Sequence, residues 1–221
     1  VDGTPMPDPG TVSFFGAGRW GSGIEIPSAD MDFWQVKDVP QGSIVEKYYW
    51  SKATESMRHC YVYLPNEYDK NPKKKYPVLY LLHSETGDEE SWLSAGRMAV
   101  ILDNLIRSGK AVPMIVVMPN CTAGEQASKS LGLPQVSGSL TKGYGATAFE
   151  SSLVGEIIPF VESHYRAVPQ KAYRALGGVA NGGAQTFNVC RMYSDKFDYI
   201  CPLSCVVEDN GHLKDDLLKI K

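Results

Sequence analysis

The stretch Gly177-Gly178-Val179-Ala180-Asn181-Gly182-Gly183 decides the fold. It follows a short apolar run and precedes a helix-like segment at residues 184–192, so it predicts a strand, a tight glycine-rich turn and a helix. In the G-x-S-x-G pattern such a turn lifts a nucleophilic serine above a sheet, and its glycines tolerate the strained backbone and close packing. Here Ala180 stands where the serine would be. The shape of a catalytic motif is present, and its reactive atom is absent.

Two continuous apolar runs precede this stretch. Residues 76–83 and 111–119 have the composition of strands buried on both faces of a parallel sheet. Residues 89–106, between them, repeat apolar side chains at helical spacing. The order strand, helix, strand predicts a parallel crossover and an α/β fold. Because ligand sites of such folds form at the carboxyl ends of the strands, the segment from His83 to Gly87 is a candidate part of a site.

The remaining segments complete one domain. Residues 45–50 and 58–64 predict a hairpin, residues 149–165 a helix, residues 197–205 a strand and turn, and residues 213–221 a short helix. Residues 120–148 are rich in Gly, Ser and Thr, which predicts a surface excursion near the ligand edge. Residues 1–44 predict an irregular arm that packs on the body through its aromatic residues. We therefore divide the chain into an arm, 1–44, and a domain, 45–221.

The composition limits the kinds of binding partner that we expect for this chain. The chain has 221 residues, is 43% hydrophobic, and balances 22 basic against 25 acidic residues, for a net charge of −3. We expect no nucleic-acid partner from this balance, and no membrane partner because no apolar run is long enough to span a membrane.

The five cysteines favour buried thiols over a disulfide framework. No phosphate loop, dinucleotide fingerprint or metal-ligand spacing predicts a cofactor, and His83 with Glu85 does not make a metal site. Asn120-Cys121-Thr122 matches the N-glycosylation pattern, which is common by chance.

Taken together, these segments resemble the α/β-hydrolase esterases of carbohydrate esterase family 1, the feruloyl and acetyl-xylan esterases similar to esterase D. The resemblance spans about residues 45 to 205 and implies a mostly parallel sheet with helices on both faces. It is carried by residues 76–83, by Trp92 with Gly96-Arg97, by residues 101–106, 113–120 and 157–166, by the glycine-rich turn, and by residues 197–200.

The resemblance also implies a site. In the family the turn serine attacks an ester carbonyl, a histidine takes its proton, an acid orients that histidine, and backbone N–H groups bind the oxyanion. When these roles are transferred to this sequence, Ala180 stands at the position of the nucleophile. Asn181, Ser84 and Glu85 form the oxyanion side, and His83 and Trp92 contact substrate.

Besides Ala180, the sequence departs from the family pattern at two further places. The family's His-Gly turn is His83-Ser84 here, and the segment after Ala180 is too short for the last strands and both catalytic partners. His212 is the only histidine after the turn, with Glu208, Asp209, Asp215 and Asp216 near it in a polar segment that we interpret as solvated surface. We therefore expect the C-terminal part of the fold to be missing.

Three functions remain open. The first is a non-catalytic relative that retains affinity for a plant cell-wall polysaccharide or its feruloyl or acetyl ester. The second is an active carboxylic ester hydrolase shown with alanine for serine and a shortened chain. The third is an assembly module, a homo-oligomer formed through an unpaired sheet edge. A secreted or periplasmic location is expected, and a cytoplasmic one stays open.

Overall fold

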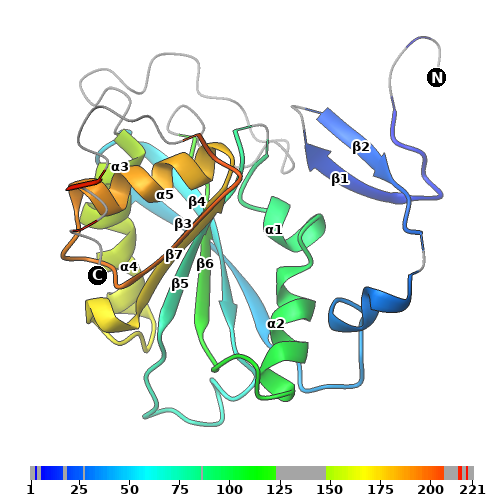
Figure 1. Ribbon diagram of the computed structural model, residues 1–221, viewed down its shortest axis with the longest axis horizontal. Coiled ribbons are helices and arrows are strands. Elements are labelled where there is room, and N and C mark those ends of the chain that lie inside the picture. Colours follow the sequence, from blue (N-terminus) through cyan, green and yellow to red (C-terminus); the bar gives the residue numbers. More distant parts are fainter. Residues whose placement is uncertain are drawn as a thin grey trace.

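A single six-stranded sheet forms the centre of the protein (Figure 1). The computed structural model describes residues 3, 6–16, 19–26, 28–85, 87–122, 148–206, 214–215 and 218. The sheet order is β3-β4-β6-β5-β7-β8. The strands are β3 (Ser43–Ser51), β4 (Ser56–Leu64), β5 (Val78–Leu82), β6 (Ile115–Pro119), β7 (Arg174–Val179) and β8 (Tyr199–Leu203).

The pairing directions match the expectations from the apolar runs. β5 pairs in parallel with β6 and with β7, and β7 pairs in parallel with β8. β3 and β4 form the predicted antiparallel hairpin, and β4 joins the parallel part through an antiparallel pairing with β6. The predicted α/β-hydrolase-like sheet is therefore confirmed.

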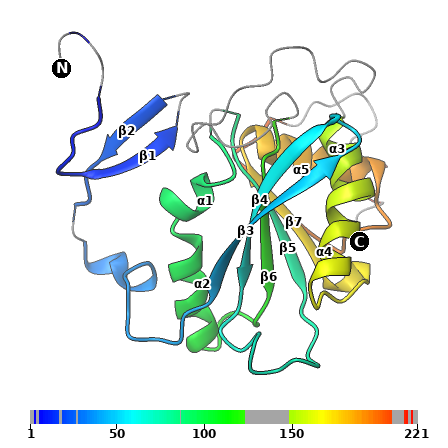
Figure 2. The same cartoon turned by 180° about the vertical axis from the view of Figure 1, so that it is seen from behind.

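Helices cover both faces of the sheet (Figure 2). On one face, α3 (Ala148–Ser152), α4 (Ile158–His164) and α5 (Asn181–Met192) pack on the larger core, which contains Tyr80, Leu82 and Leu176. On the other face, α1 (Ser91–Ser94) and α2 (Met98–Arg107) pack on a smaller core around Val116 and Met118. The apolar runs are thus buried on both faces, as their composition predicts.

The helix expected over residues 89–106 is wrong in one respect, because the structure divides it into α1 and α2. Arg97 has a left-handed backbone, with φ of 48°, which ends one helix and begins the other. A Cβ on Gly96 would lie 2.8 Å from the Trp92 carbonyl oxygen, so the break also depends on a glycine. The helix expected over residues 149–165 is continuous, but its middle, Leu153–Ile157, is a π-helical turn.

The N-terminal arm has more regular structure than its composition suggests. β1 (Val12–Gly16) and β2 (Arg19–Gly23) form a separate antiparallel hairpin, and Ala29–Phe33 is a 3₁₀ helix. Polar contacts attach the arm to α2. The Asn104 side-chain amide donates to the carbonyl oxygens of Phe33 and Gln35, each at 3.0 Å, and the Gly42 N–H donates to the Asp103 carboxylate at 2.9 Å.

Several expectations fall on residues that the structure does not describe. The excursion expected at residues 120–148 lies outside the described residues from 123 to 147. Glu208, Asp209, His212 and Asp216 lie outside them too, and so does most of the helix expected at 213–221. Within the described part of the chain, every helix is too short or too polar to cross a membrane.

Candidate functional site at the glycine-rich turn

Ala180 occupies the tip of the turn between β7 and α5. Its φ of 54° and ψ of −115° are unusual for a residue with a side chain, and such a conformation costs about 1–3 kcal/mol. Two hydrogen bonds hold it. The Ala180 N–H donates to the Leu203 carbonyl oxygen at 2.9 Å, and the Ala180 carbonyl accepts from the Ala184 N–H at 3.0 Å. The methyl group is exposed, so the strained turn presents a small apolar side chain to solvent.

The glycines of the turn are required by close backbone contacts. A Cβ on Gly178 would lie 2.4 Å from the Gly182 carbonyl oxygen, and a Cβ on Gly182 would lie 2.4 Å from the His83 carbonyl oxygen. These separations are shorter than any real Cβ contact. The start of α5 therefore packs directly on the segment that follows β5, which brings Asn181 and Ser84 to the same end of the sheet.

His83 joins the ends of two strands. It is buried, and its Nε2 accepts from the Cys121 N–H at 3.0 Å, so the ring proton sits on Nδ1 and is donated to the Ser84 carbonyl at 2.6 Å. The Cys121 thiol in turn donates to the His83 carbonyl oxygen at 3.4 Å. Through these hydrogen bonds the imidazole connects the turn after β5 to the segment after β6. The substrate-contacting role predicted for His83 stays a prediction.

The predicted oxyanion residues lie around this turn. The Gly87 N–H donates to the Ser84 carbonyl oxygen at 3.0 Å and closes a four-residue turn. Ser84 is half-buried, whereas Glu85 and Asn181 are exposed. The structure therefore brings the three predicted residues to one end of the sheet, and their roles stay predictions.

Trp92 supports the turn from below. Its indole N–H donates to the Leu82 carbonyl oxygen at 3.0 Å, and its half-buried ring packs with the smaller core. These contacts give Trp92 a structural use at the end of β5. The predicted contact of Trp92 with substrate stays a prediction.

Sequence reasoning missed a buried polar cluster beside the turn. The Glu89 carboxylate accepts from the Asn120 amide at 2.8 Å and contacts His59 Nδ1 at 2.7 Å. Arg58 donates to the Asn120 carbonyl at 2.9 Å, and Gln185 of α5 donates to the Cys121 carbonyl at 3.0 Å. The cluster connects β4, the segment before α1, the end of β6 and α5. Glu89 and Asn120 lie far apart in the sequence, and only the tertiary structure shows that they are buried together beside His59.

The same cluster argues against glycosylation at Asn120, where the sequence matches the N-glycosylation pattern. Asn120 is fully buried, and the nitrogen that would carry a glycan donates to Glu89. The folded protein therefore offers no acceptor there.

The cysteines do not provide a substitute nucleophile in the described core. All five are free thiols, of which Cys60, Cys121 and Cys190 are buried. Burial raises the pKa of the Cys121 thiol to about 12, so it is protonated at neutral pH and unreactive. Among the residues that the structure describes, no three His, Cys, Asp or Glu side chains are grouped as a metal site.

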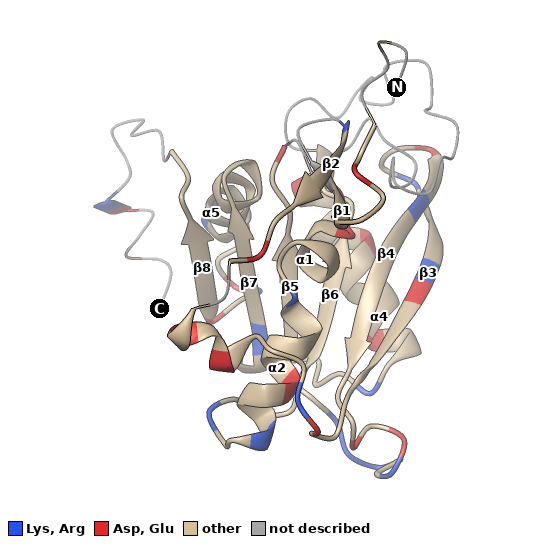
Figure 3. Ribbon diagram, turned by 90° about the vertical axis from the view of Figure 1, so that its right-hand side faces the viewer, with Lys and Arg blue, Asp and Glu red and all other residues tan. Residues whose placement is uncertain are grey.

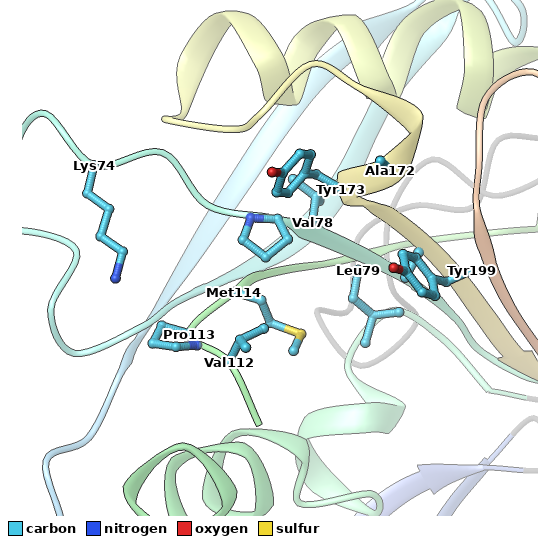
Figure 4. Close-up of a pocket in the computed structure, with 11 residues that line it drawn as sticks. Lys74, Val78, Leu79, Val112, Pro113, Met114, Ala172, Tyr173 and Tyr199 are labelled. Carbon is cyan, nitrogen blue, oxygen red and sulfur yellow. The ribbon is translucent and has the colours of Figure 1, made fainter. Parts of the chain in front are cut away.

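A cavity lies at the end of the strands opposite to the glycine-rich turn (Figure 4). It has a volume of about 710 Å³ and is lined mainly by apolar side chains, including Leu79, Met114, Tyr173 and Tyr199. These residues come from the starts of β5, β6 and β8 and from the segment before β7. It is therefore separate from the turn at Ala180.

Known proteins are similar to this chain in sequence. Residues 51–213 match the family model described as "Putative esterase". An endo-1,4-beta-xylanase/feruloyl esterase of Xylanibacter ruminicola is 37% identical over 203 residues, which are 90% of this chain and 27% of the relative.

Two solved structures are also similar. A CE1 ferulic acid esterase from Anaeromyces mucronatus, in complex with ferulic acid, has a TM-score of 0.63 at 30% identity, over 80% of this chain and 64% of the other. A serine-to-alanine mutant of the feruloyl esterase module from Clostridium thermocellum, complexed with sinapinate, has a TM-score of 0.66 at 26% identity, over 88% and 64%. The chain thus spans about a quarter of the curated relative and less than two thirds of either solved chain.

Proposed function

Because this chain belongs to the esterase family that its residues 51–213 match, we propose that it binds a feruloyl-type ester of a plant polysaccharide at the glycine-rich turn and does not hydrolyse it through that turn. One observation carries the proposal. Ala180 retains the strained backbone of a nucleophile-bearing turn, while its side chain is a methyl group that cannot attack a carbonyl. A plant polysaccharide as the ligand implies that the protein acts outside the cytoplasm.

The surroundings of the turn favour binding. Tight contacts around Gly178 and Gly182 hold the backbone rigidly, and the His83 and Glu89 contacts fix the neighbouring segments. Backbone N–H groups fixed before a ligand arrives lose little entropy when they bind it. We assign the Asn181 N–H and the Ser84–Glu85 turn to the carbonyl or carboxylate oxygen of the acyl group.

The solved relatives support an acyl site of this kind. The Clostridium thermocellum module carries alanine in place of a serine and is complexed with sinapinate. That complex indicates that a related fold binds a hydroxycinnamate after a serine has been replaced by alanine. This chain likewise presents an alanine, Ala180, at the tip of the turn.

Titration with ferulate and with sinapinate, followed by calorimetry, tests the proposal. We expect saturable binding by this chain and its loss in Ala180→Leu, because the larger side chain at the exposed tip fills the acyl site. Ala172→Leu is the matched control, since Ala172 lines the cavity at the other end of the sheet. Binding lost in Ala172→Leu and kept in Ala180→Leu would place the ligand in that cavity and overturn the proposal, as would absence of binding by this chain.

A second function, carboxylic ester hydrolysis by a serine-bearing form, is favoured by the same backbone. The φ and ψ of Ala180 would present a serine hydroxyl at the exposed tip without rearrangement. Methyl ferulate and p-nitrophenyl acetate should be assayed with this chain and with Ala180→Ser. Turnover by the variant alone would establish the hydrolase reading, whereas silence in both supports the non-catalytic one.

A further inference from the structure

The apolar cavity of Figure 4 lies on the face of the sheet that α2 covers in part. Leu79 and Met114 line the cavity and also pack against the smaller core beneath α2. Beyond that core the same face continues over β7 and β8. Tyr199 and Leu203 of β8 point to this face and are 62% and 44% exposed. The cavity is therefore an open hollow beside α2.

The register of the strands explains why a hollow forms there. Leu79 of β5, Ala175 of β7 and Tyr199 of β8 are neighbours in one row across the sheet, and such neighbours point to the same face. Ala175 places only a methyl group between two large side chains. The floor of the cavity is thus low at Ala175 and is bounded by Leu79 and Tyr199.

The two ends of the cavity differ in chemistry. In Figure 4 Lys74 lies at one end, Leu79 and Tyr199 lie at the other, and Met114 and Tyr173 lie between them. Among the eleven described residues that line the cavity, Lys74 alone is charged. The volume of about 710 Å³ is that of a pocket which encloses a small molecule. A ligand that fills it therefore has a long apolar part and one charged end.

Positive charge gathers at the Lys74 end. Lys73 and Lys75 flank Lys74 in the chain and are exposed. The Lys74 ammonium pairs with Glu67, and since an ammonium has three N–H donors, this ion pair leaves donors for a second anion. No acidic residue lies on β5, β6, β7 or β8, as the colouring of these strands in Figure 3 shows. The charged end of a ligand is therefore expected to be an anion.

We propose that this cavity binds a long-chain aliphatic carboxylate, with the carboxylate at Lys74 and the hydrocarbon chain along Met114 toward Ala175 and Tyr199. Burial of the methylene groups supplies the affinity, and the ion pair with Lys74 sets the direction of the chain. Such a ligand also covers the side chain of Tyr173, which is 46% exposed. The site is separate from the acyl site proposed at Ala180, because it lies at the opposite end of the strands.

Calorimetric titration with octanoate, decanoate and dodecanoate, each below its micelle concentration, tests the site. One molecule should bind per chain, and the affinity should rise severalfold with each added pair of methylene groups, because each buried methylene adds to the transfer free energy. Decyltrimethylammonium has a chain of the same length as decanoate and the opposite charge. It should bind more weakly than decanoate, because its head group is repelled by the lysines.

A lysine variant tests the charged end. Lys74→Gln should weaken decanoate binding severalfold, as expected for the loss of a partly exposed ion pair. Lys70→Gln is the matched control, because Lys70 belongs to the same loop and is not one of the residues that line the cavity. Its substitution should leave decanoate binding unchanged.

Two kinds of variant test the apolar end. Ala175→Leu fills the hollow and should weaken decanoate binding about tenfold. Because this change also crowds the sheet, Ala172→Leu at the exposed rim is a second filling variant, and it should weaken binding severalfold without loss of thermal stability. Tyr199→Ala removes a wall and should also weaken binding. Tyr48→Ala is its matched control, because Tyr48 is 45% exposed on β3 and is not one of the residues that line the cavity.

The outcomes separate this inference from the proposed function. Ferulate binding should survive in Lys74→Gln and in Tyr199→Ala, and decanoate binding should survive in Ala180→Leu. Absence of saturable one-to-one binding, equal affinity for decyltrimethylammonium, or equal effects of Lys74→Gln and Lys70→Gln would refute the carboxylate site while the acyl site stands. Light scattering that shows a dimer broken by Tyr199→Ala would make the hollow a contact between two copies and would also refute it.

Discussion

Gly182 lies so close to His83 that a Cβ on Gly182 would sit 2.4 Å from the His83 carbonyl oxygen. Gly182 belongs to α5 and His83 to the segment after β5, and the two residues are 99 positions apart in the chain. This contact sets the distance between the turn at Ala180 and the predicted oxyanion side. The site geometry therefore depends on the absence of a single methyl group.

Gly182→Ala should destabilise the fold by about 3 kcal/mol, because the added methyl group meets backbone atoms that cannot move aside cheaply. Gly155→Ala is the control. Gly155 has nothing within 4 Å of its would-be Cβ, so alanine there should be neutral or stabilise by about 0.5 kcal/mol. Urea unfolding followed by circular dichroism measures both, and equal effects at the two glycines would contradict the packing argument.

A second relationship, between Glu89 and Asn120, stabilises the segment beneath the site. Asn120→Ala removes the donor to a fully buried carboxylate and an acceptor of the Arg58 guanidinium, so we expect a loss of about 3 kcal/mol. Asn66→Ala, whose side-chain hydrogen bonds lie at the surface, should cost less than about 1 kcal/mol.

The reciprocal exchange of these two side chains sharpens the test. In Glu89→Gln with Asn120→Asp, the new amide can donate to the new carboxylate and still accept from His59. We expect the double variant to be more stable than the sum of the single variants predicts. Additive losses in denaturant unfolding would mean that the two side chains are not coupled.

The central fold could be predicted from the sequence because two of its parallel strands are continuous apolar runs that pack into the cores on both faces of the sheet. Residues 76–83 and 111–119 contain β5 and β6, and the glycine-rich turn falls where its pattern indicates. The break at Arg97 was missed, because the apolar spacing continues across it and only the left-handed backbone reveals it.

Parts of the candidate site could not be predicted, for a different reason. Glu89 and Asn120 are 31 positions apart, and their burial depends on the packing of segments that the sequence does not place together. The β1–β2 hairpin was also missed, because Gly21 and Gly23 read as loop residues until the Phe14 ring is seen over them.

The edge strand β8 supports the assembly hypothesis less than its position suggests. The Leu203 carbonyl faces β7, since it accepts from the Ala180 N–H. Because polar backbone groups alternate sides along a strand, the backbone of Pro202 faces away from β7 and has no N–H to offer on that side. We predict that the chain does not pair through this edge and that Pro202→Val increases association. Light scattering over a concentration series checks both, and a dimer unaffected by substitutions in β8 would place any interface elsewhere.

The buried thiols give the fold a dependence on alkaline pH. Burial raises the pKa of Cys60 and of Cys121 to about 12 from an ordinary value of 9.0. A group whose pKa is raised in the folded state contributes its stability below the unfolded pKa and loses it as the pH rises toward the folded pKa. The free energy of unfolding should therefore fall between pH 9 and pH 12. In the Cys121→Ala variant the free energy of unfolding should fall less steeply over this range.

At pH 8 a thiol reagent should label exposed Cys201 rapidly and label Cys121 only after unfolding. Equal labelling rates at the two cysteines in the folded protein would show that Cys121 is not enclosed as described.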